Sequence, residues 1–186
     1  MRTGAFRYLF FSFLFLLTDV TVSGFDWTPD LVGAAILLLG LRELKVFDAE
    51  YGAGFGKTAL WGRVLLALGA GKAVLCFWRA AEWLLPWLCA ASGLAAAVAV
   101  WFCGAGVFRL AIQAGQRSLV ISLRQSVFTV CSCCVSVSCS KALSAGLGTE
   151  PSLLSFAIIT AASVAAALWF CAQLLRAQKL LRPFFG

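Results

Sequence analysis

The segment Leu84-Leu-Pro-Trp-Leu-Cys-Ala-Ala-Ser-Gly-Leu-Ala-Ala-Ala-Val-Ala-Val-Trp-Phe-Cys-Gly-Ala-Gly-Val-Phe108 decides the fold of this chain, because it contains no charged residue. A helix needs about 20 predominantly apolar residues to cross a lipid bilayer. This segment is longer than that, and Pro86 falls in its first turn, where a proline is tolerated. The sequence therefore predicts a transmembrane helix here.

The rest of the chain has the same apolar character. Hydrophobic residues make up 62% of the 186 residues, charged residues make up 12%, and there is no His. A soluble domain of this length would present many more charged side chains to water. The length accommodates about six membrane spans with short connections. The composition therefore predicts an all-α fold, a polytopic transmembrane helical bundle that forms a single integral membrane domain over residues 1–186.

Six apolar segments are the expected spans, separated by short breaks. Their approximate bounds are Phe6–Val22, Leu31–Leu44, Ala59–Phe77, Leu84–Phe108, Gln125–Leu143 and Leu153–Leu175. We expect Lys45–Thr58 to be a loop or a surface helix and Ser144–Pro151 to be a turn. The segment Arg109–Arg124 is amphipathic, which predicts that it lies in the membrane interface or extends a neighbouring helix.

The basic residues predict the orientation of these spans. Lys and Arg favour the cytoplasmic side of a membrane protein. If the N-terminus is cytoplasmic and the spans alternate, that side carries Arg2, Arg7, Arg42, Lys45, Lys57, Arg63, Arg109, Arg117, Arg124, Arg176, Lys179 and Arg182. The opposite side keeps Arg79 and Lys141, with Lys72 near the middle of the third span. We therefore expect both termini in the cytoplasm.

A motif precedes and opens the second span. It reads Gly24-Phe25-Asp26-Trp27-Thr28-Pro29-Asp30-Leu31-Val32-Gly33, and Gly40-Leu41 follow. Thr28, Pro29 and Asp30 are residues typical of a helix start. The pattern resembles G-F-D-x-x-P-D-x-x-G in the first hairpin of a group of small uncharacterised membrane proteins of Firmicutes-type bacteria. The likeness covers roughly the first quarter of the chain, and Trp27 departs from the aliphatic residue usual there. The resemblance implies a multi-pass protein of the bacterial cytoplasmic (inner) membrane and implies no known activity.

Five ionisable residues are the candidate polar or functional positions: Asp19, Asp26, Asp30, Lys72 and Glu82. An ionisable side chain within a membrane is a functional candidate because it is costly there. Lys72 could pair with Asp19 or Glu82. The structural alternative stays open: Asp30 would stabilise a helix start, Asp26 would belong to a turn, and Asp19 would lie close to the interface.

Small residues predict where helices approach one another closely. Gly33 and Gly40 are seven residues apart, so they share one face of the second span. Small side chains at such spacing let helix backbones approach each other. Further surfaces of this kind are expected at Ala34, Gly69, Gly71, Gly93, Ala97, Gly104 and Gly106.

Two motifs resemble ligand sites but favour other interpretations. The segment Tyr51–Thr58 ends in Gly-Lys-Thr, yet it has Tyr51 where a phosphate-binding loop needs glycine. Cys131, Cys133, Cys134 and Cys139 cluster in the fifth span with neither His nor an acid nearby, and such thiols behave as small hydrophobes. We expect no nucleotide, metal or cofactor, and no nucleic acid because no long basic run is present.

Two functions fit the sequence better than catalysis does. Acid–base or nucleophilic chemistry needs a positioned pair of groups, and none is evident without His. The first hypothesis is a non-enzymatic accessory or interaction protein whose partners are the lipid bilayer and other membrane proteins or itself. The alternative is a small-solute, ion or proton-coupled transporter that uses Asp19, Lys72 or Glu82. Polar residues facing a cavity inside the bundle would favour transport.

Overall fold

The computed structural model describes residues 4–17, 21–22, 25–26, 30–51, 54–77, 83–147 and 153–185. These residues form six helices: α1 (Ala5–Leu17), α2 (Asp30–Tyr51), α3 (Phe55–Phe77), α4 (Leu85–Gln113), α5 (Arg117–Leu147) and α6 (Leu153–Phe185). Two short strands, β1 (Thr21–Val22) and β2 (Phe25–Asp26), pair antiparallel between α1 and α2. The predicted fold class, an all-α bundle of six helices, is confirmed.

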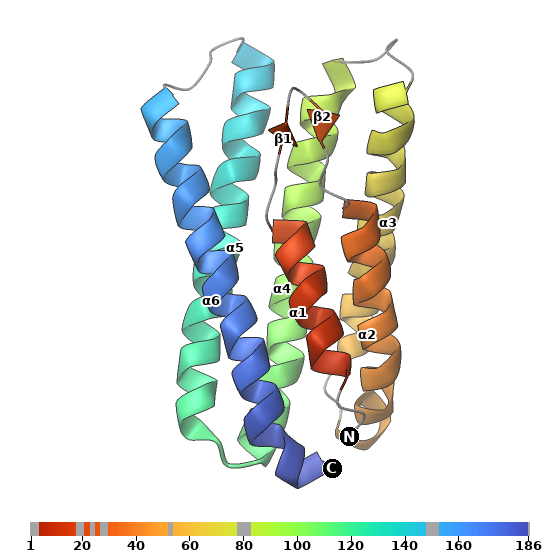
Figure 1. Ribbon diagram of the computed structural model, residues 1–186, viewed down its shortest axis with the longest axis vertical. Coiled ribbons are helices and arrows are strands. Elements are labelled where there is room, and N and C mark those ends of the chain that lie inside the picture. The colour runs from red at the N-terminus through yellow and green to blue at the C-terminus, as the bar shows by residue number, and fades with distance from the viewer. Residues whose placement is uncertain are drawn as a thin grey trace.

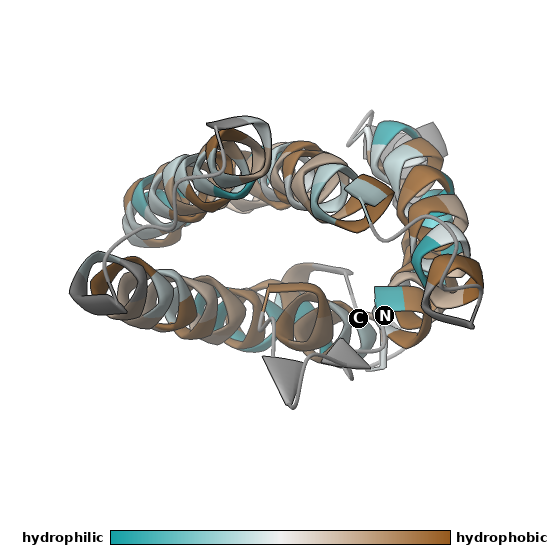
Figure 2. Cartoon of the chain, turned by 90° about the horizontal axis from the view of Figure 1, so that it is seen from above, coloured by the Kyte–Doolittle hydropathy of each residue, from teal (hydrophilic) through white to brown (hydrophobic). Residues whose placement is uncertain are grey.

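The helices run up and down and close a ring, as Figures 1 and 2 show. Each helix contacts the next along the chain, and α1 also contacts α6. Helix α1 begins and α6 ends at the lower end of Figure 1. We call the part that contains α1 and Ala166–Phe185 of α6 the lower half. The upper half contains the strand pair and the first part of α6, up to Ala165.

Four of the helices, α3 to α6, are long and apolar enough to cross a membrane. The chain is therefore a membrane protein. Helix α1 is apolar but has 13 residues, which gives about 20 Å of helix against a hydrocarbon core of about 30 Å. Helix α2 carries Arg42, Glu43 and Lys45 in its second half. Helix α1 is thus much shorter than the others, whereas α2, with 22 residues, is about as long as α3, with 23.

The first span ends earlier than predicted. It was expected to reach Val22, but Thr21 and Val22 form β1, which pairs with β2. Thr and Val are β-branched, and such residues favour strands over helices. The apolar character of these residues made them look like a continuation of the helix, although their branching favours the strand.

Other helices are longer than predicted. Residues 45–51 continue α2, and α3 already begins at Phe55. The amphipathic segment Arg109–Arg124 extends two helices: its first residues end α4 and its last residues begin α5. Gly115, at φ +68°, makes the turn between them, because glycine adopts positive φ without strain.

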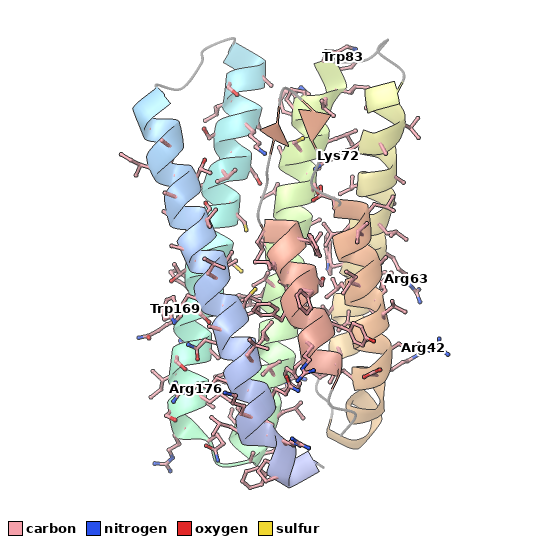
Figure 3. The ribbon with its side chains drawn as sticks, viewed as in Figure 1. Arg42, Arg63, Lys72, Trp83, Trp169 and Arg176 are labelled. Carbon is pink, nitrogen blue, oxygen red and sulfur yellow. The ribbon has the colours of Figure 1, made fainter. Side chains whose placement is uncertain are left out.

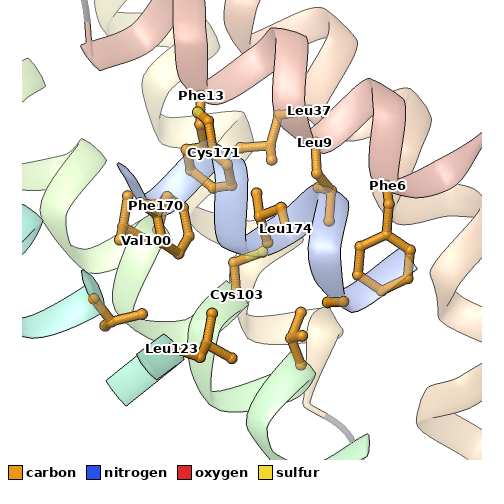
Figure 4. Packing of buried hydrophobic residues seen from close by; sticks show 14 of the residues in the cluster. Phe6, Leu9, Phe13, Leu37, Val100, Cys103, Leu123, Phe170, Cys171 and Leu174 are labelled. Carbon is orange, nitrogen blue, oxygen red and sulfur yellow. The ribbon is translucent and has the colours of Figure 1, made fainter. Parts of the chain in front are cut away.

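The core fills the middle of the ring in the lower half. Phe13 of α1 and Phe170 of α6 are fully buried, and their rings meet edge to face with centroids 5.4 Å apart. Figure 4 shows Leu9, Cys103 and Leu174 packed beside them, so that α1, α4 and α6 share one apolar centre. This packing joins the first helix to the last and closes the ring.

The two motif glycines lie against α1. A Cβ on Gly33 would lie 2.9 Å from Leu16 Cγ, and a Cβ on Gly40 would lie 2.9 Å from Tyr8 Cβ. Neither position has room for a larger side chain without movement of α1. The spacing that the sequence analysis noted therefore corresponds to the face of α2 that packs against α1.

Candidate functional site

A buried ion pair joins α2 and α3 in the upper half of the bundle. Lys72 Nζ lies 2.5 Å from Asp30 Oδ2, and Ser92 Oγ of α4 donates a hydrogen bond of 3.1 Å to the same oxygen. Asp30 is 8% exposed, Lys72 6% and Ser92 5%. We call these three residues the Asp30 cluster. It lies inside the corner of the ring where α2, α3 and α4 meet, and Figure 3 shows Lys72 there.

The start of α2 positions the carboxylate. Asp30 is the first residue of this helix, where unpaired N–H groups and the helix dipole favour a negative charge. Gly69 of α3 lies against the same helix start, because a Cβ there would be 3.0 Å from Leu31 N. Gly69 precedes Lys72 by one turn on the same face. The close approach at the glycine therefore brings the lysine side chain to Asp30.

Pairing is what makes these charges tolerable inside the bundle. An isolated buried charge costs several kcal/mol, and an opposite charge with further hydrogen bonds offsets that cost. Asp30 accepts from both an ammonium and a hydroxyl. The chemistry open to such a cluster is to hold helices together or to exchange a proton or cation at the carboxylate.

The structure brings together two of the five candidate polar residues, Asp30 and Lys72. The sequence analysis paired Lys72 with Asp19 or Glu82, and both of these lie outside the described residues. It named Asp30 as a candidate polar residue, with a helix start as the structural alternative, but did not pair it with Lys72. The structure shows that Asp30 starts the helix and binds Lys72 as well. Ser92 was missed, because a serine in an apolar run carries no signal of its own.

Two further residues of the hairpin motif are described, and both lie in β2. Gly24 and Pro29 are outside the described residues. Phe25 and Asp26 form β2, in which Asp26 is opposite Thr21. The structural alternative placed Asp26 in a turn, but it lies in a strand pair whose other members are strand-favouring residues.

The first part of α6 is loosely packed. Among the side chains described from Ser155 to Ala165, which do not include that of Phe156, none is buried. The exposed positions include Ala157, Ala161 and Ala162, and Ile158 is 60% exposed. Small side chains of this kind let another helix approach closely. The upper half of α6 therefore presents a helix surface that this chain itself leaves largely uncovered.

The Gly-Lys-Thr segment lies in the first turn of α3 and packs against α4. Lys57 Nζ lies 5.6 Å from the centroid of the Phe102 ring, and Thr58 is fully buried. Tyr51 ends α2, so a helix precedes the segment where a phosphate-binding loop has a strand. In this structure Lys57 contacts α4, and Thr58 is buried inside the bundle.

Two thiols make contacts between helices. Cys131 Sγ donates to Ala97 O at 3.3 Å, and Cys171 Sγ donates to Phe10 O at 3.7 Å. Within the described part of the chain, no three His, Cys, Asp or Glu side chains gather as a metal site would require. The thiols that these bonds involve act as small packing residues with a weak donor.

Fold and site together define the class of the protein as an integral membrane helical bundle with a buried ion pair between its second and third helices. No protein-family model matches the chain, and no curated protein or solved structure matches it either. The resemblance to small Firmicutes-type membrane proteins therefore stays a prediction that rests on the hairpin motif.

Proposed function

We propose that this protein is a non-enzymatic accessory or interaction protein of the bacterial cytoplasmic membrane. It would bind another membrane protein, or a second copy of itself, through the upper half of α6. The observation that carries this proposal is that no described side chain from Ser155 to Ala165 is buried, although the same helix is packed from Ala166 onward. A transmembrane helix of a partner would cover this surface by close packing on its alanines.

The proposed orientation places the lower end in the cytoplasm. Figure 3 shows Arg42 and Arg176 toward this end and Lys72 and Trp83 toward the other. Basic residues favour the cytoplasmic side, and tryptophan is enriched at membrane interfaces. On this proposal the open part of α6 lies in the outer half of the membrane.

Photo-crosslinking in intact cells tests the interaction. A photoreactive amino acid at Ala161 should give one discrete protein adduct, whereas the same group at Leu60, which is 59% exposed on α3, should give none. Ala165→Leu should remove the Ala161 adduct by crowding the same surface. An adduct of twice the chain mass would identify a second copy as the partner. Equal, diffuse labelling at Ala161 and Leu60 would contradict the proposal.

The second candidate function is an ion or proton-coupled transporter. The Asp30 cluster favours it, because ionisable side chains buried in membrane bundles often mark proton or ion routes. Transport would require the Lys72–Asp30 pair to open and the carboxylate to exchange its partner. The accessory function instead requires the pair to stay closed and hold α2 against α3.

Flux measurements distinguish the two functions. The full chain would be reconstituted into vesicles that enclose a pH-sensitive dye, under an imposed pH gradient. A transporter should show proton flux that Asp30→Asn abolishes, while Lys179→Met, a change at an exposed lysine of α6, leaves it intact. The accessory function predicts the same leak as empty vesicles for all three proteins.

A further inference from the structure

A groove of about 830 Å³ runs along the contact between α4 and α5. Its rim carries large exposed side chains: Trp101 is 53% exposed, Ile121 61% and Phe128 67%. The groove therefore opens to the outside of the ring, on the surface that faces lipid. Its volume lies within the roughly 300–1,000 Å³ typical of sites for small organic ligands.

The groove exists because two small residues of α4, Gly104 and Ala105, lie between two large ones. At Gly104, α4 comes so close to α5 that a Cβ would collide with Val127. Ala105 beside it leaves depth, while Trp101 and Phe108 form the wall on α4. The result is a mostly apolar trough that extends about 10 Å along α4, from Trp101 to Phe108, and can hold part of a hydrocarbon chain.

The lining includes one charged side chain, that of Arg124, with the Gln125 amide next to it. Arg124 is seven residues after Arg117, the first residue of α5, which places it about 10 Å along the helix axis from the lower end. A guanidinium binds phosphate oxygens through two parallel hydrogen bonds. Basic pockets between transmembrane helices bind the headgroups of anionic lipids in this way.

We propose that this groove binds an anionic phospholipid, with the headgroup phosphate at Arg124 and one acyl chain along Trp101, Ala105 and Phe128. The apolar wall is complementary to the acyl chain of such a lipid, and the guanidinium of Arg124 is complementary to its phosphate. The site is separate from the upper half of α6 and from the Asp30 cluster. A bound lipid there would reinforce the α4–α5 contact from outside the ring.

Native mass spectrometry of the full chain, purified in a mild detergent and stripped of lipid, tests the site. Phosphatidylglycerol and phosphatidylcholine are added at equal concentration. The protein should retain phosphatidylglycerol in preference, and Arg124→Gln should reduce the bound fraction about fivefold to tenfold and remove the preference. Ala105→Phe, which fills the trough, should reduce the binding of both lipids. Thermal unfolding without lipid verifies that each variant is folded.

Arg117→Gln is the matched control, because it removes a positive charge from the same helix outside the groove lining. It should leave the preference for phosphatidylglycerol unchanged. An equal loss in Arg117→Gln and Arg124→Gln would show unspecific charge attraction and overturn the proposal. Wild-type binding in Arg124→Gln or in Ala105→Phe would also overturn it. Displacement of the lipid by millimolar inorganic phosphate would indicate a plain anion site and contradict the lipid assignment.

Discussion

The two halves of α6 belong to one apolar helix, but only the lower half is built into the core. Phe170, Cys171 and Leu174 are fully buried, whereas no described side chain from Ser155 to Ala165 is buried. The difference follows from the length of α1. Phe13, close to the end of α1, meets Phe170, so α1 covers α6 only below that level. A short first helix thus leaves the upper half of the last helix uncovered.

The position of α2 explains why the Asp30 cluster is buried. Helix α2 begins at Asp30, below the tops of α3 and α4 in Figure 1. Asp30 is therefore buried in the bundle, where its carboxylate needs partners. Lys72 and Ser92 provide them. The lower half is thus held by apolar packing. The upper half contains a charged pair and the uncovered part of α6.

Removing a core ring should give the largest effect. Phe170→Ala leaves a cavity between α1 and α6 and should lower the free energy of unfolding by about 3–5 kcal/mol. Ile158→Ala, on the exposed part of the same helix, should change it by less than about 0.5 kcal/mol. Unfolding in detergent, followed by circular dichroism, measures both. Similar losses of unfolding free energy in both variants would contradict the claim that only the lower half of α6 is packed into the core.

Breaking the ion pair should come next in size. Lys72→Met leaves Asp30 as a buried charge without its ammonium and should cost about 3 kcal/mol. The double variant Asp30→Asn/Lys72→Met removes both charges and should recover most of that loss. Lys179→Met serves as the control at an exposed lysine. If the double variant is no more stable than Lys72→Met, the pair does not act as a unit.

The smallest of these effects concerns the packing of the first hairpin. Gly40→Ala places a Cβ 2.9 Å from Tyr8 Cβ and 3.2 Å from Ala5 O, and such crowding costs about 1–3 kcal/mol. Gly71→Ala is the matched control, because a Cβ there meets nothing within 4 Å. It should be neutral or stabilising by up to about 1 kcal/mol, since alanine favours helices more than glycine. Equal destabilisation by both variants would contradict the close contact of α1 and α2.

The sequence predicted the helices well and their contacts poorly. Apolar runs longer than a bilayer is thick leave few alternatives to helices, so the bundle followed from composition. The strand at Thr21 and Val22 was missed because it lies in an apolar stretch that also fits a span. The ion pair was missed because Asp30 and Lys72 are 42 residues apart, and their meeting depends on which helix faces pack. The available signal was Gly69, one turn before Lys72, because a glycine there indicates the face of α3 on which another helix approaches closely.

The central claim is that α6 is packed below Ala165 and open above it. An alanine-to-leucine scan along α6, read out as the thermal stability of the purified chain, tests this with one kind of substitution throughout. The account predicts clear losses at the buried positions Ala166, Ala167 and Ala177, and no loss at the exposed positions Ala157, Ala161 and Ala162. Losses at Ala161 and Ala162 as large as those at Ala166 and Ala167 would contradict it.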